Sequence, residues 1–368
     1  MSEPQAGMVG GFDVARLGRW LADRCDVVTP IAVDRVAGGR SNLTAIVTGA
    51  DGRRVVVRRP PLSGVLASAH DVVREGRIMA ALAGTAVPVP DVLTTADEQD
   101  GPGTAVLVTA HVDGTVVRDR RAASQLEPTE RARLTDAVPT ILALLHEVDV
   151  DAVGLGDLAR RDGYLARQVA RWSRQLDAGS DRELPELVEL ARVLAASVPE
   201  QREVTLVHGD YRLDNLIVDV TTGGVRAVLD WELATLGDPL ADLGTLLAYW
   251  GVPASGDLPA SAVHPDLPTA LEGFAHPTGL VATYTAVRGL DADEVAARLR
   301  PFLAFAWFRI ACILEGVRVR TASGGYGAVD DEGRAELSVL SDLVPDLAAR
   351  GLRMVRGHGP VGFDHELT

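Results

Sequence analysis

The stretch Leu206-Val-His-Gly-Asp-Tyr-Arg-Leu-Asp-Asn-Leu-Ile-Val-Asp219 places a short polar segment between two apolar runs. The apolar runs predict two short strands that hold the polar segment as a rigid loop. Functional side chains are commonly carried on such loops, because the scaffold fixes their positions. We therefore expect a site here, built from the polar residues His208, Gly209, Asp210, Arg212, Asp214 and Asn215.

The composition limits the classes of protein to consider. The 368 residues, 47% of them hydrophobic, suffice for one large domain or two subdomains. The 36 Lys and Arg residues against 51 Asp and Glu residues give a net charge of −15. Because nucleic-acid-binding proteins need a basic face, we expect no nucleic-acid partner. We interpret the acidity as an aid to solubility, with attraction of a cationic substrate as the alternative.

The chain has only two cysteines, Cys25 and Cys312, so it has no disulfide framework or zinc-binding spacing. Met1 to Val9 lacks the pattern of a signal peptide. The most apolar stretch, Phe302 to Leu314, is too short to span a membrane and contains Arg309. We expect a cytoplasmic protein without a membrane segment, and the oligomeric state stays open.

Three β-rich runs near the N-terminus predict an antiparallel meander: Ile31–Val36, Leu43–Val47 and Arg54–Arg58. Glycine amides in the first turn can approach phosphates closely, because glycine has no side chain. An ordinary Gly-Gly hairpin is the alternative. The candidate phosphate-binding residues of this turn are Gly38, Gly39, Ser41 and Asn42.

A cation stands at the end of the third run, and a carboxylate stands in the predicted helix that follows. Arg58 ends the run, and Glu75 lies 17 positions later within Ala67–Leu82, which has helical spacing. A kinase-like site uses such a cation to hold nucleotide phosphates and such a carboxylate to orient the cation. The alternative is that both residues are solvated surface charges.

The chain changes character near residue 110. Thr104–Val108 predicts a strand, and His111–Gly114 predicts a turn in which backbone groups of Ala110 and Val112 would meet an adenine ring. Helical patterns dominate afterwards. This order, with a cation at a strand end and a carboxylate in the next helix, resembles that of bilobal kinases, and the resemblance implies an α+β, bilobal protein-kinase-like fold. Residues 1–112 would form a small β-rich nucleotide-binding lobe, and residues 113–368 a large helical lobe with the catalytic loop, the metal site and the substrate cleft.

A second carboxylate, Asp230, lies 15 positions after Asn215. Val218–Val220 and Val225–Leu229 flank the turn Thr221–Gly224, which predicts a hairpin that returns Asp230 to the side of Asn215. Phosphoryl transfer needs a carboxylate that orients and deprotonates the attacking hydroxyl, and it needs hard oxygen ligands for Mg²⁺. Asp210 suits the first role, and Asn215 and Asp230 suit the second. The alternative is a polar β-turn, since Asp, Asn and Gly favour turns.

The other polar residues of the loop have supporting interpretations. We expect His208 to hold the loop by hydrogen bonding rather than to transfer a proton, and Asp214 to make structural hydrogen bonds. Arg212 either supports the loop or meets an anionic group of the substrate, and the sequence leaves both options open.

These segments together resemble the aminoglycoside phosphotransferase (APH)/choline kinase family, in particular the branch similar to the kinase domain of acyl-CoA dehydrogenase fusion proteins. The resemblance implies that Asp210 is the base, that Asn215 and Asp230 bind Mg²⁺, and that Arg58 and Glu75 anchor the phosphates. It departs from protein kinases in Arg58, where lysine is usual, and in Trp231-Glu232 in place of Phe-Gly. The segments that carry the resemblance are Val57–Pro61, Ser68–His70, Val87–Pro90, Asp151–Gly156, His208–Asn215, Asp230–Glu232, Gly237–Pro239 and Asp242–Leu243.

The expected function is ATP- and Mg²⁺-dependent phosphorylation of a hydroxyl on a small molecule, either aminoglycoside-like, a hydroxy acid or a hydroxyacyl-CoA. A nucleotide-binding pseudokinase or regulatory protein without transfer activity is the alternative. A protein kinase is disfavoured, because the segment between Asp230 and Asp238 is too short for an activation loop.

Further predictions concern the C-terminal part. Phe302–Ile310 is rich in aromatic residues and forms either core or a hydrophobic substrate wall, with core favoured. Thr278 is a candidate N-cap for a helix over Leu280–Arg288, and a further helix is predicted over Ala292–Leu299. His264 and His276 are interpreted as surface-loop residues, with contact to the substrate as the alternative.

Overall fold

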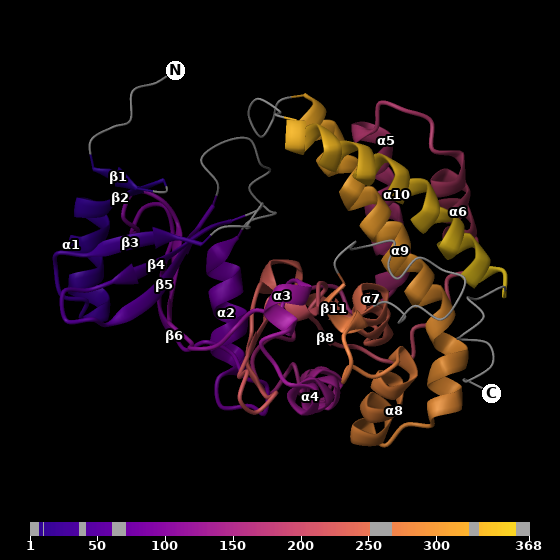
Figure 1. Cartoon of the computed structure of the whole chain (residues 1–368), viewed down its shortest axis with the longest axis horizontal. Helices are drawn as coiled ribbons and strands as arrows, with labels where there is room; N and C mark the ends of the chain where they lie inside the picture. Colours follow the sequence, from indigo (N-terminus) through magenta and orange to yellow (C-terminus); the bar gives the residue numbers. More distant parts are fainter. Residues whose placement is uncertain are drawn as a thin grey trace. The chain divides into compact units, whose positions relative to one another are not determined.

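The computed structural model describes residues 7–9, 11–36, 42–60, 71–250, 267–323 and 331–357, without the side chains of residues 331–338 and 340. The chain divides into two compact units. The first consists of Met1–Gly114, Val153–Leu155 and Arg226–Leu233, and the remaining residues form the second. The first unit contains the large sheet, and the second is mainly helical, which confirms the predicted α+β class (Figure 1).

The first unit is built on an antiparallel sheet of five strands in the order β3-β4-β5-β7-β6. The pairing of β3 with β4 and of β4 with β5 confirms the predicted meander. Arg58 of β5 lies opposite Thr44 of β4 and Leu107 of β7, so it belongs to the central strand. The strands are β3 (Ala32–Arg35), β4 (Leu43–Thr48), β5 (Arg54–Arg59), β6 (Val92–Ala96) and β7 (Val106–Ala110), preceded by the short pair β1 (Met8–Val9) and β2 (Phe12–Asp13).

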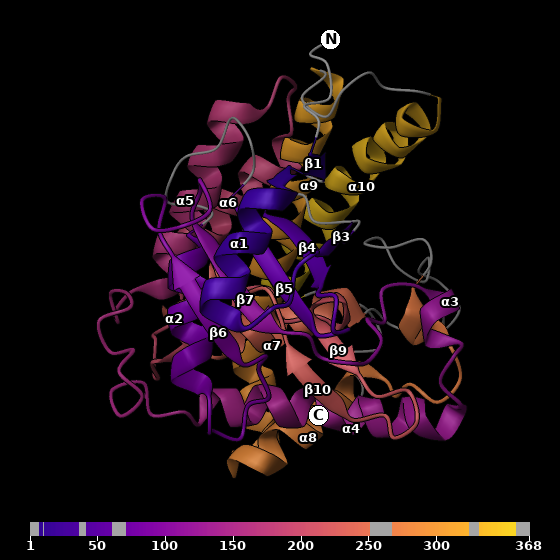
Figure 2. The same ribbon diagram turned by 90° about the vertical axis from the view of Figure 1, so that its left-hand side faces the viewer.

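Two helices cover the sheet (Figure 2). Helix α1 (Val14–Cys25) buries Leu21 in one core with Val106 and Val108, while α2 (Val72–Leu82) packs on β6 and β7. A side chain at Gly76 of α2 would lie 2.4 Å from Thr95 Cγ2, so the close approach of α2 to β6 requires glycine. Because strand residues alternate between faces, Val106 and Val108 face α1, and Leu107 faces α2. Glu75, which belongs to α2, therefore lies on the face of the sheet that Leu107 occupies.

In the second unit, the helices α5, α6, α7, α8 and α10 pack against α9, and α4 packs against α8. The sequence predicted a helix over Ala292–Leu299 and a separate aromatic stretch, but α9 continues through Pro301. The buried side chains of Phe302, Phe305 and Phe308 confirm that this stretch is core. The helices are α3 (Arg120–Ala123), α4 (Pro128–His146), α5 (Tyr164–Gly179), α6 (Pro185–Ala196), α7 (Leu240–Trp250), α8 (Pro277–Arg288), α9 (Ala292–Ala322) and α10 (Asp331–Val355).

Short strands and turns complete the second unit. β8 (Thr205–Val207) pairs antiparallel with β11 (Thr235–Gly237). After the short 3₁₀ helix η1 (Leu213–Asn215), β9 (Leu216–Val218) runs into a turn where the Asp219 amide donates to Gly224 O at 2.9 Å. The chain then enters β10 (Val225–Val228) and the 3₁₀ helix η2 (Trp231–Leu233), which belong to the first unit from Arg226 onward. The 3₁₀ helix η3 (Pro268–Ala270) lies further on, in the second unit.

The expected N-cap at Thr278 is wrong. Helix α8 begins at Pro277, and the His276 side chain caps it by accepting from the Thr278 amide at 3.4 Å. Proline suits the first helical position because its fixed φ matches the helix and it lacks an amide hydrogen that would need a partner. The helix therefore starts earlier than the apolar spacing indicated, and His276 is a capping residue. His264 lies outside the described residues.

Two other features bear on the predictions from composition. In the described part of the chain, no helix is both long and apolar enough to cross a bilayer. Cys25 and Cys312 are both buried as free thiols.

Candidate active site

The polar loop after β8 is anchored by a carboxylate from α7. Asp242 accepts hydrogen bonds from the amides of His208, at 2.6 Å, and Gly209, at 2.8 Å. Gly209 has φ +83°, in the left-handed region that favours glycine. The turn that presents Asp210 therefore depends on a glycine and on two backbone amides bound to one buried acid.

Asp242 is held in turn by buried groups. His146 Nε2 lies 3.4 Å from Asp242 Oδ2, and His146 Nδ1 lies 2.8 Å from the hydroxyl of Tyr284. Burial lowers the pKa of His146, which favours the neutral ring. His146 thus links α4 to α7 and α8.

Asp210 has different partners on its two carboxylate oxygens. Oδ2 accepts from Arg212 Nε at 3.2 Å and from Asn215 Nδ2 at 3.0 Å, while Oδ1 is 3.4 Å from Arg309 NH2. Burial acts to raise the pKa of Asp210, but the charges of Arg212 and Arg309 outweigh it and hold that pKa below its ordinary value. Asp210 is therefore a carboxylate at neutral pH, and its Oδ1 retains capacity to accept a proton.

The neighbours of Asp210 shape the loop. His208 is fully buried, and its Nδ1 accepts from the Asp210 amide at 3.2 Å. Arg212 lies over the ring of Tyr249, with its guanidinium carbon 4.7 Å from the ring centroid, and pairs with Asp214 at 3.0 Å. In the structure His208, Arg212 and Asp214 thus all make contacts within or beside the loop.

Asn215 returns to Asp210 because of η1. The Asn215 amide donates to Arg212 O at 3.0 Å, which closes a tight turn. Its side-chain Nδ2 donates to the Asp210 carbonyl at 2.8 Å as well as to the Asp210 carboxylate. Because the nitrogen is committed in this way, Oδ1 is the side-chain atom of Asn215 that can bind a cation.

The first unit brings together three predicted residues. Arg58 NH1 lies 3.0 Å from Glu75 Oε1, and Arg58 NH2 lies 2.9 Å from Asp230 Oδ1. Glu75 is 1% exposed, and burial raises its pKa to about 7 against the opposing charge of Arg58. A guanidinium has two terminal nitrogens in one plane, so it can bridge two carboxylates in a way that a single ammonium cannot.

Asp230 has φ +67°, an uncommon conformation for a residue with a side chain. The next residue, Trp231, donates its amide toward Glu75 Oε1 at 3.4 Å. Strained backbone of this kind persists where surrounding contacts enforce it, and it is frequent at functional sites.

The remaining predicted nucleotide-binding residues divide into two groups. Asn42 is 2% exposed, and its Nδ2 donates to Glu232 Oε2 at 3.3 Å. Ala110 ends β7, and its amide donates to Asp91 O at 2.8 Å, while Val112 follows in the next turn. Gly38, Gly39 and Ser41 lie outside the described residues.

Sequence reasoning missed Arg309, which contacts Asp210 from α9. The contacts of Asp242 with the His208 and Gly209 amides were likewise not predicted. The available signal for Arg309 was a single cation inside the apolar run Phe302–Leu314. A buried charge needs a partner, and the structure identifies the partner as the polar loop.

The predicted metal ligands are hard oxygen donors. Asn215 belongs to the second unit and Asp230 to the first. Among the described residues, no group of three or more His, Cys, Asp or Glu side chains could hold a metal ion. An amide oxygen and a carboxylate suit Mg²⁺, which takes few protein ligands and completes its shell with water and phosphate oxygens.

An antiparallel sheet unit, a helical unit and a loop that presents Asp210 beside Asn215 define a phosphotransferase of the protein-kinase-like class. The chain belongs to the phosphotransferase enzyme family (APH), whose family model matches residues 32–290. A solved structure of a candidate aminoglycoside phosphotransferase from Ralstonia eutropha JMP134 is similar, with 30% identity and a TM-score of 0.73 over 94% of this chain and 99% of that one. An ethanolamine kinase from Plasmodium vivax shares the fold at 13% identity and a TM-score of 0.56, over 90% of this chain and 86% of that one.

Longer proteins carry a similar segment. The chain is 34% identical to acyl-CoA dehydrogenase family member 10 of Mus musculus over 326 residues, which are 86% of this chain and 29% of that protein. It is 34% identical to family member 11 of Gallus gallus over 350 residues, which are 93% of this chain and 43% of that protein. The chain therefore spans less than half the length of either relative, and these similarities confirm the branch that the sequence motifs indicated.

Proposed function

We propose that this protein is a small-molecule kinase that transfers the γ-phosphoryl group of ATP to a hydroxyl of its substrate with the help of Mg²⁺. The observation that carries the proposal is the environment of Asp210. Its carboxylate is ionised and held on a rigid loop, and its Oδ1 retains acceptor capacity. A base that orients an attacking hydroxyl needs this combination.

In the proposed reaction, the acceptor oxygen forms a bond to the γ-phosphorus as the bond from that phosphorus to the β–γ bridging oxygen breaks. ADP leaves with the electron pair of the broken bond, and Asp210 takes the hydroxyl proton. Because Asp210 has a lowered pKa, its main contribution is to orient the hydroxyl, and the proton moves as the new bond forms. His208 and Arg212 support this residue by holding its backbone and its Oδ2.

Asn215 and Asp230 are the proposed Mg²⁺ ligands. Asn215 offers its Oδ1, and Asp230 is a carboxylate kept in an uncommon backbone conformation beside Arg58. Bound Mg²⁺ would offset the negative charge of the phosphate oxygens and so lower the barrier to attack.

Arg58 and Glu75 are proposed to hold the nucleotide phosphates, with Glu75 orienting the guanidinium. The turn of Gly38, Gly39, Ser41 and Asn42 remains the proposed phosphate loop. Backbone groups of Ala110 and Val112 are proposed to meet the base. Because the Ala110 amide bonds Asp91, a contact from Ala110 would use its carbonyl oxygen. Solved structures of similar fold include an aminoglycoside 2'-phosphotransferase-IIIa with GDP and an APH(4)-Ia variant with AMP-PNP and hygromycin B, which supports a purine nucleotide.

The charge near Asp210 bears on the acceptor. A pocket in the second unit is lined by Arg118, Arg212 and Tyr249, and Arg212 also contacts Asp210. Asp214 contributes one compensating carboxylate to the same lining. Because Arg212 is paired with both Asp210 and Asp214, the exposed Arg118 is the guanidinium that would meet the acceptor. Arg118 and the ring of Tyr249 suit an acceptor with an anionic group, so we favour a hydroxy acid or hydroxyacyl-CoA over a cationic aminoglycoside.

A panel of acceptors would test both parts of the proposal. ADP release is measured with ATP and Mg²⁺ against short hydroxy acids, hydroxyacyl-CoA thioesters and aminoglycosides, with and without EDTA. We expect turnover with an anionic acceptor and its loss in EDTA. Turnover with aminoglycosides alone would overturn the acceptor assignment. Nucleotide binding without transfer to any acceptor would favour the pseudokinase.

Arg118→Ala sharpens the acceptor test, because Arg118 is exposed and lines the pocket. We expect a KM for the anionic acceptor about 10-fold higher, which corresponds to the loss of one charge-assisted hydrogen bond, and an unchanged KM for ATP. Arg121→Ala is the matched control, since Arg121 is an exposed arginine outside the pocket lining.

A further inference from the structure

Helix α9 carries a buried arginine at its centre. Arg309 is 4% exposed and stands between Phe308 and Ile310, which are both fully buried or nearly so. A guanidinium in such surroundings loses its hydration and must recover the lost interactions from protein groups. The partners of Arg309 therefore indicate its role in the protein.

The partners of Arg309 lie on the catalytic loop. Its NH1 donates to the carbonyl of Gly209, and its NH2 lies 3.4 Å from Asp210 Oδ1. Its Nε is buried and has no hydrogen-bond partner among the described residues. The interactions that compensate the buried charge thus come from two adjacent residues of the loop, and one of them is the proposed base.

The two contacts complement the others that hold Asp210. Arg212 and Asn215 hold Oδ2, whereas Arg309 approaches Oδ1. Asp242 holds the Gly209 peptide by its amide, and Arg309 holds the carbonyl of the same residue. Arg309 therefore restrains both the rotation of the carboxylate and the orientation of the peptide that precedes it.

We propose that Arg309 is a positioning residue for phosphoryl transfer, one that reaches from α9 to set the orientation of Asp210 through the Gly209 carbonyl and Asp210 Oδ1. This inference rests on the proposed kinase function. A misplacement of about 1 Å at a reacting group can cost about 100-fold in rate, so the contact affects turnover more than it affects the binding of nucleotide.

The experiment compares Arg309→Met and Arg309→Lys with the wild-type chain. We expect Arg309→Met to lower kcat by about 10- to 100-fold with the KM for ATP within about 2-fold, because the loop loses its restraint while the nucleotide-binding residues are untouched. Arg309→Lys keeps one donor and the charge, so it should recover part of that loss.

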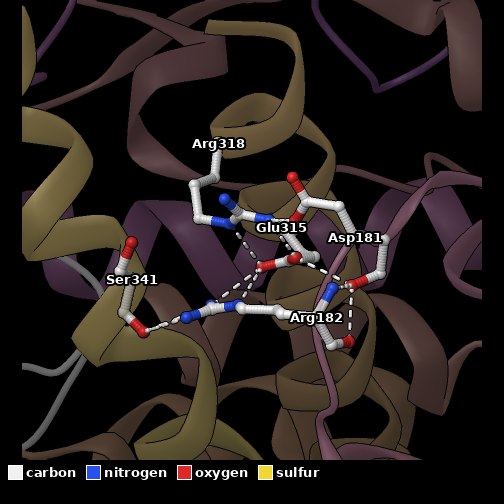
Figure 3. A network of polar contacts seen from close by, with 6 residues as sticks. Asp181, Arg182, Glu315, Arg318 and Ser341 are labelled. Carbon is white, nitrogen blue, oxygen red and sulfur yellow. Dashed lines mark hydrogen bonds and ion pairs between the residues drawn. The ribbon is translucent and has the colours of Figure 1, made fainter. Parts of the chain in front are cut away.

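Arg318→Met is the matched control. Arg318 lies on the same helix and is also paired and mostly buried, but its partners are Glu315 and Asp181 (Figure 3). We expect this variant to be less stable and to keep kcat within about 2-fold at a temperature where it is folded. Circular dichroism identifies any variant that fails to fold. If Arg309→Met fails to fold, Arg309→Lys carries the test, and it must lower kcat while leaving the KM for ATP within about 2-fold.

The outcomes separate the two proposals. A wild-type chain that transfers no phosphate overturns the kinase function. A wild-type chain that does transfer, together with a folded Arg309→Met of unchanged kcat, overturns only the role of Arg309. Equal losses of kcat in Arg309→Met and Arg318→Met would also overturn it, because they would indicate a general effect of stability.

Discussion

Asp210 and Glu315 are both carboxylates that contact two arginines, yet they differ in how many hydrogen bonds their two oxygens accept. Glu315 Oε1 accepts from Ser180 at 2.9 Å and Arg318 at 2.8 Å. Its Oε2 accepts from Arg182 Nε at 3.1 Å and from Arg318 Nε at 3.1 Å (Figure 3). Among the residues that the structure describes, Asp210 has two donors on Oδ2 and only the 3.4 Å approach of Arg309 on Oδ1.

The backbone differs as well. Glu315 lies within α9 and is 1% exposed, and Arg182 connects it to the Ser341 carbonyl of α10 at 3.3 Å. Asp210 lies on a loop after a left-handed glycine, with 19% of its side chain exposed. A saturated, buried carboxylate joins elements of the fold, whereas an incompletely saturated one at the surface of a rigid loop retains an oxygen for chemistry.

The largest expected effect follows from replacing each acid by its amide. Asp210→Asn removes the proton acceptor and should lower kcat by about 10²- to 10⁴-fold while ATP binding survives. Glu315→Gln should change kcat by no more than about 2-fold when the protein is folded. Steady-state rates and nucleotide titrations measure both variants. Near-normal turnover in Asp210→Asn would remove the basis for distinguishing the two carboxylates.

The second effect is on stability, where we expect the replacement of Glu315 to matter more than that of Asp210. Glu315→Gln leaves Arg182 and Arg318 without their shared carboxylate, and removing one partner of a buried ion pair costs about 3–5 kcal/mol. Because Arg182 is 29% exposed and Arg318 13% exposed, water replaces part of this interaction, and we expect about 2–3 kcal/mol. Urea unfolding monitored by circular dichroism gives the value.

Glu294→Gln is the control for that measurement, because Glu294 lies on the same helix and pairs with Arg202 at an exposed position. Its loss should be within about 0.5 kcal/mol. Equal losses in the two variants would show that saturation of the Glu315 carboxylate adds nothing to stability.

The smallest effect is in the pH dependence of stability. Burial acts to raise the pKa of Glu315, but hydrogen bonds from Arg318, Arg182 and Ser180 outweigh it and lower that pKa below its ordinary value of 4.5. A lowered pKa in the folded state means that the stabilisation is present above the unfolded pKa and is lost as the pH falls through the folded pKa. The difference in unfolding free energy between wild type and Glu315→Gln should therefore be constant near neutrality and shrink below about pH 4.5. A difference that grows on acidification would contradict the assigned sign.

The sequence alone determined the fold class and the family, and it located the polar loop as the candidate site. Local signals suffice for these, because the spacing of His208, Asp210 and Asn215 between apolar runs is read directly from neighbouring positions. The pairing of Arg58 with Glu75 was inferred from the order of strand and helix, and the structure contains it at 3.0 Å. The assigned roles of these residues in catalysis are proposals that the experiments above test.

Only the tertiary structure decided which distant residues complete each site. Asp242 lies more than 30 positions from the amides that it holds, Arg309 lies about 100 positions from Asp210, and Arg182 lies more than 130 positions from Glu315. No local pattern specifies such partners, because a buried charge in a sequence states that a counter-charge is needed without stating where the chain supplies it. The packing of α9 against α5, α7 and α10 makes that choice, and it makes one arginine of the helix a neighbour of the proposed base and another part of a structural cluster.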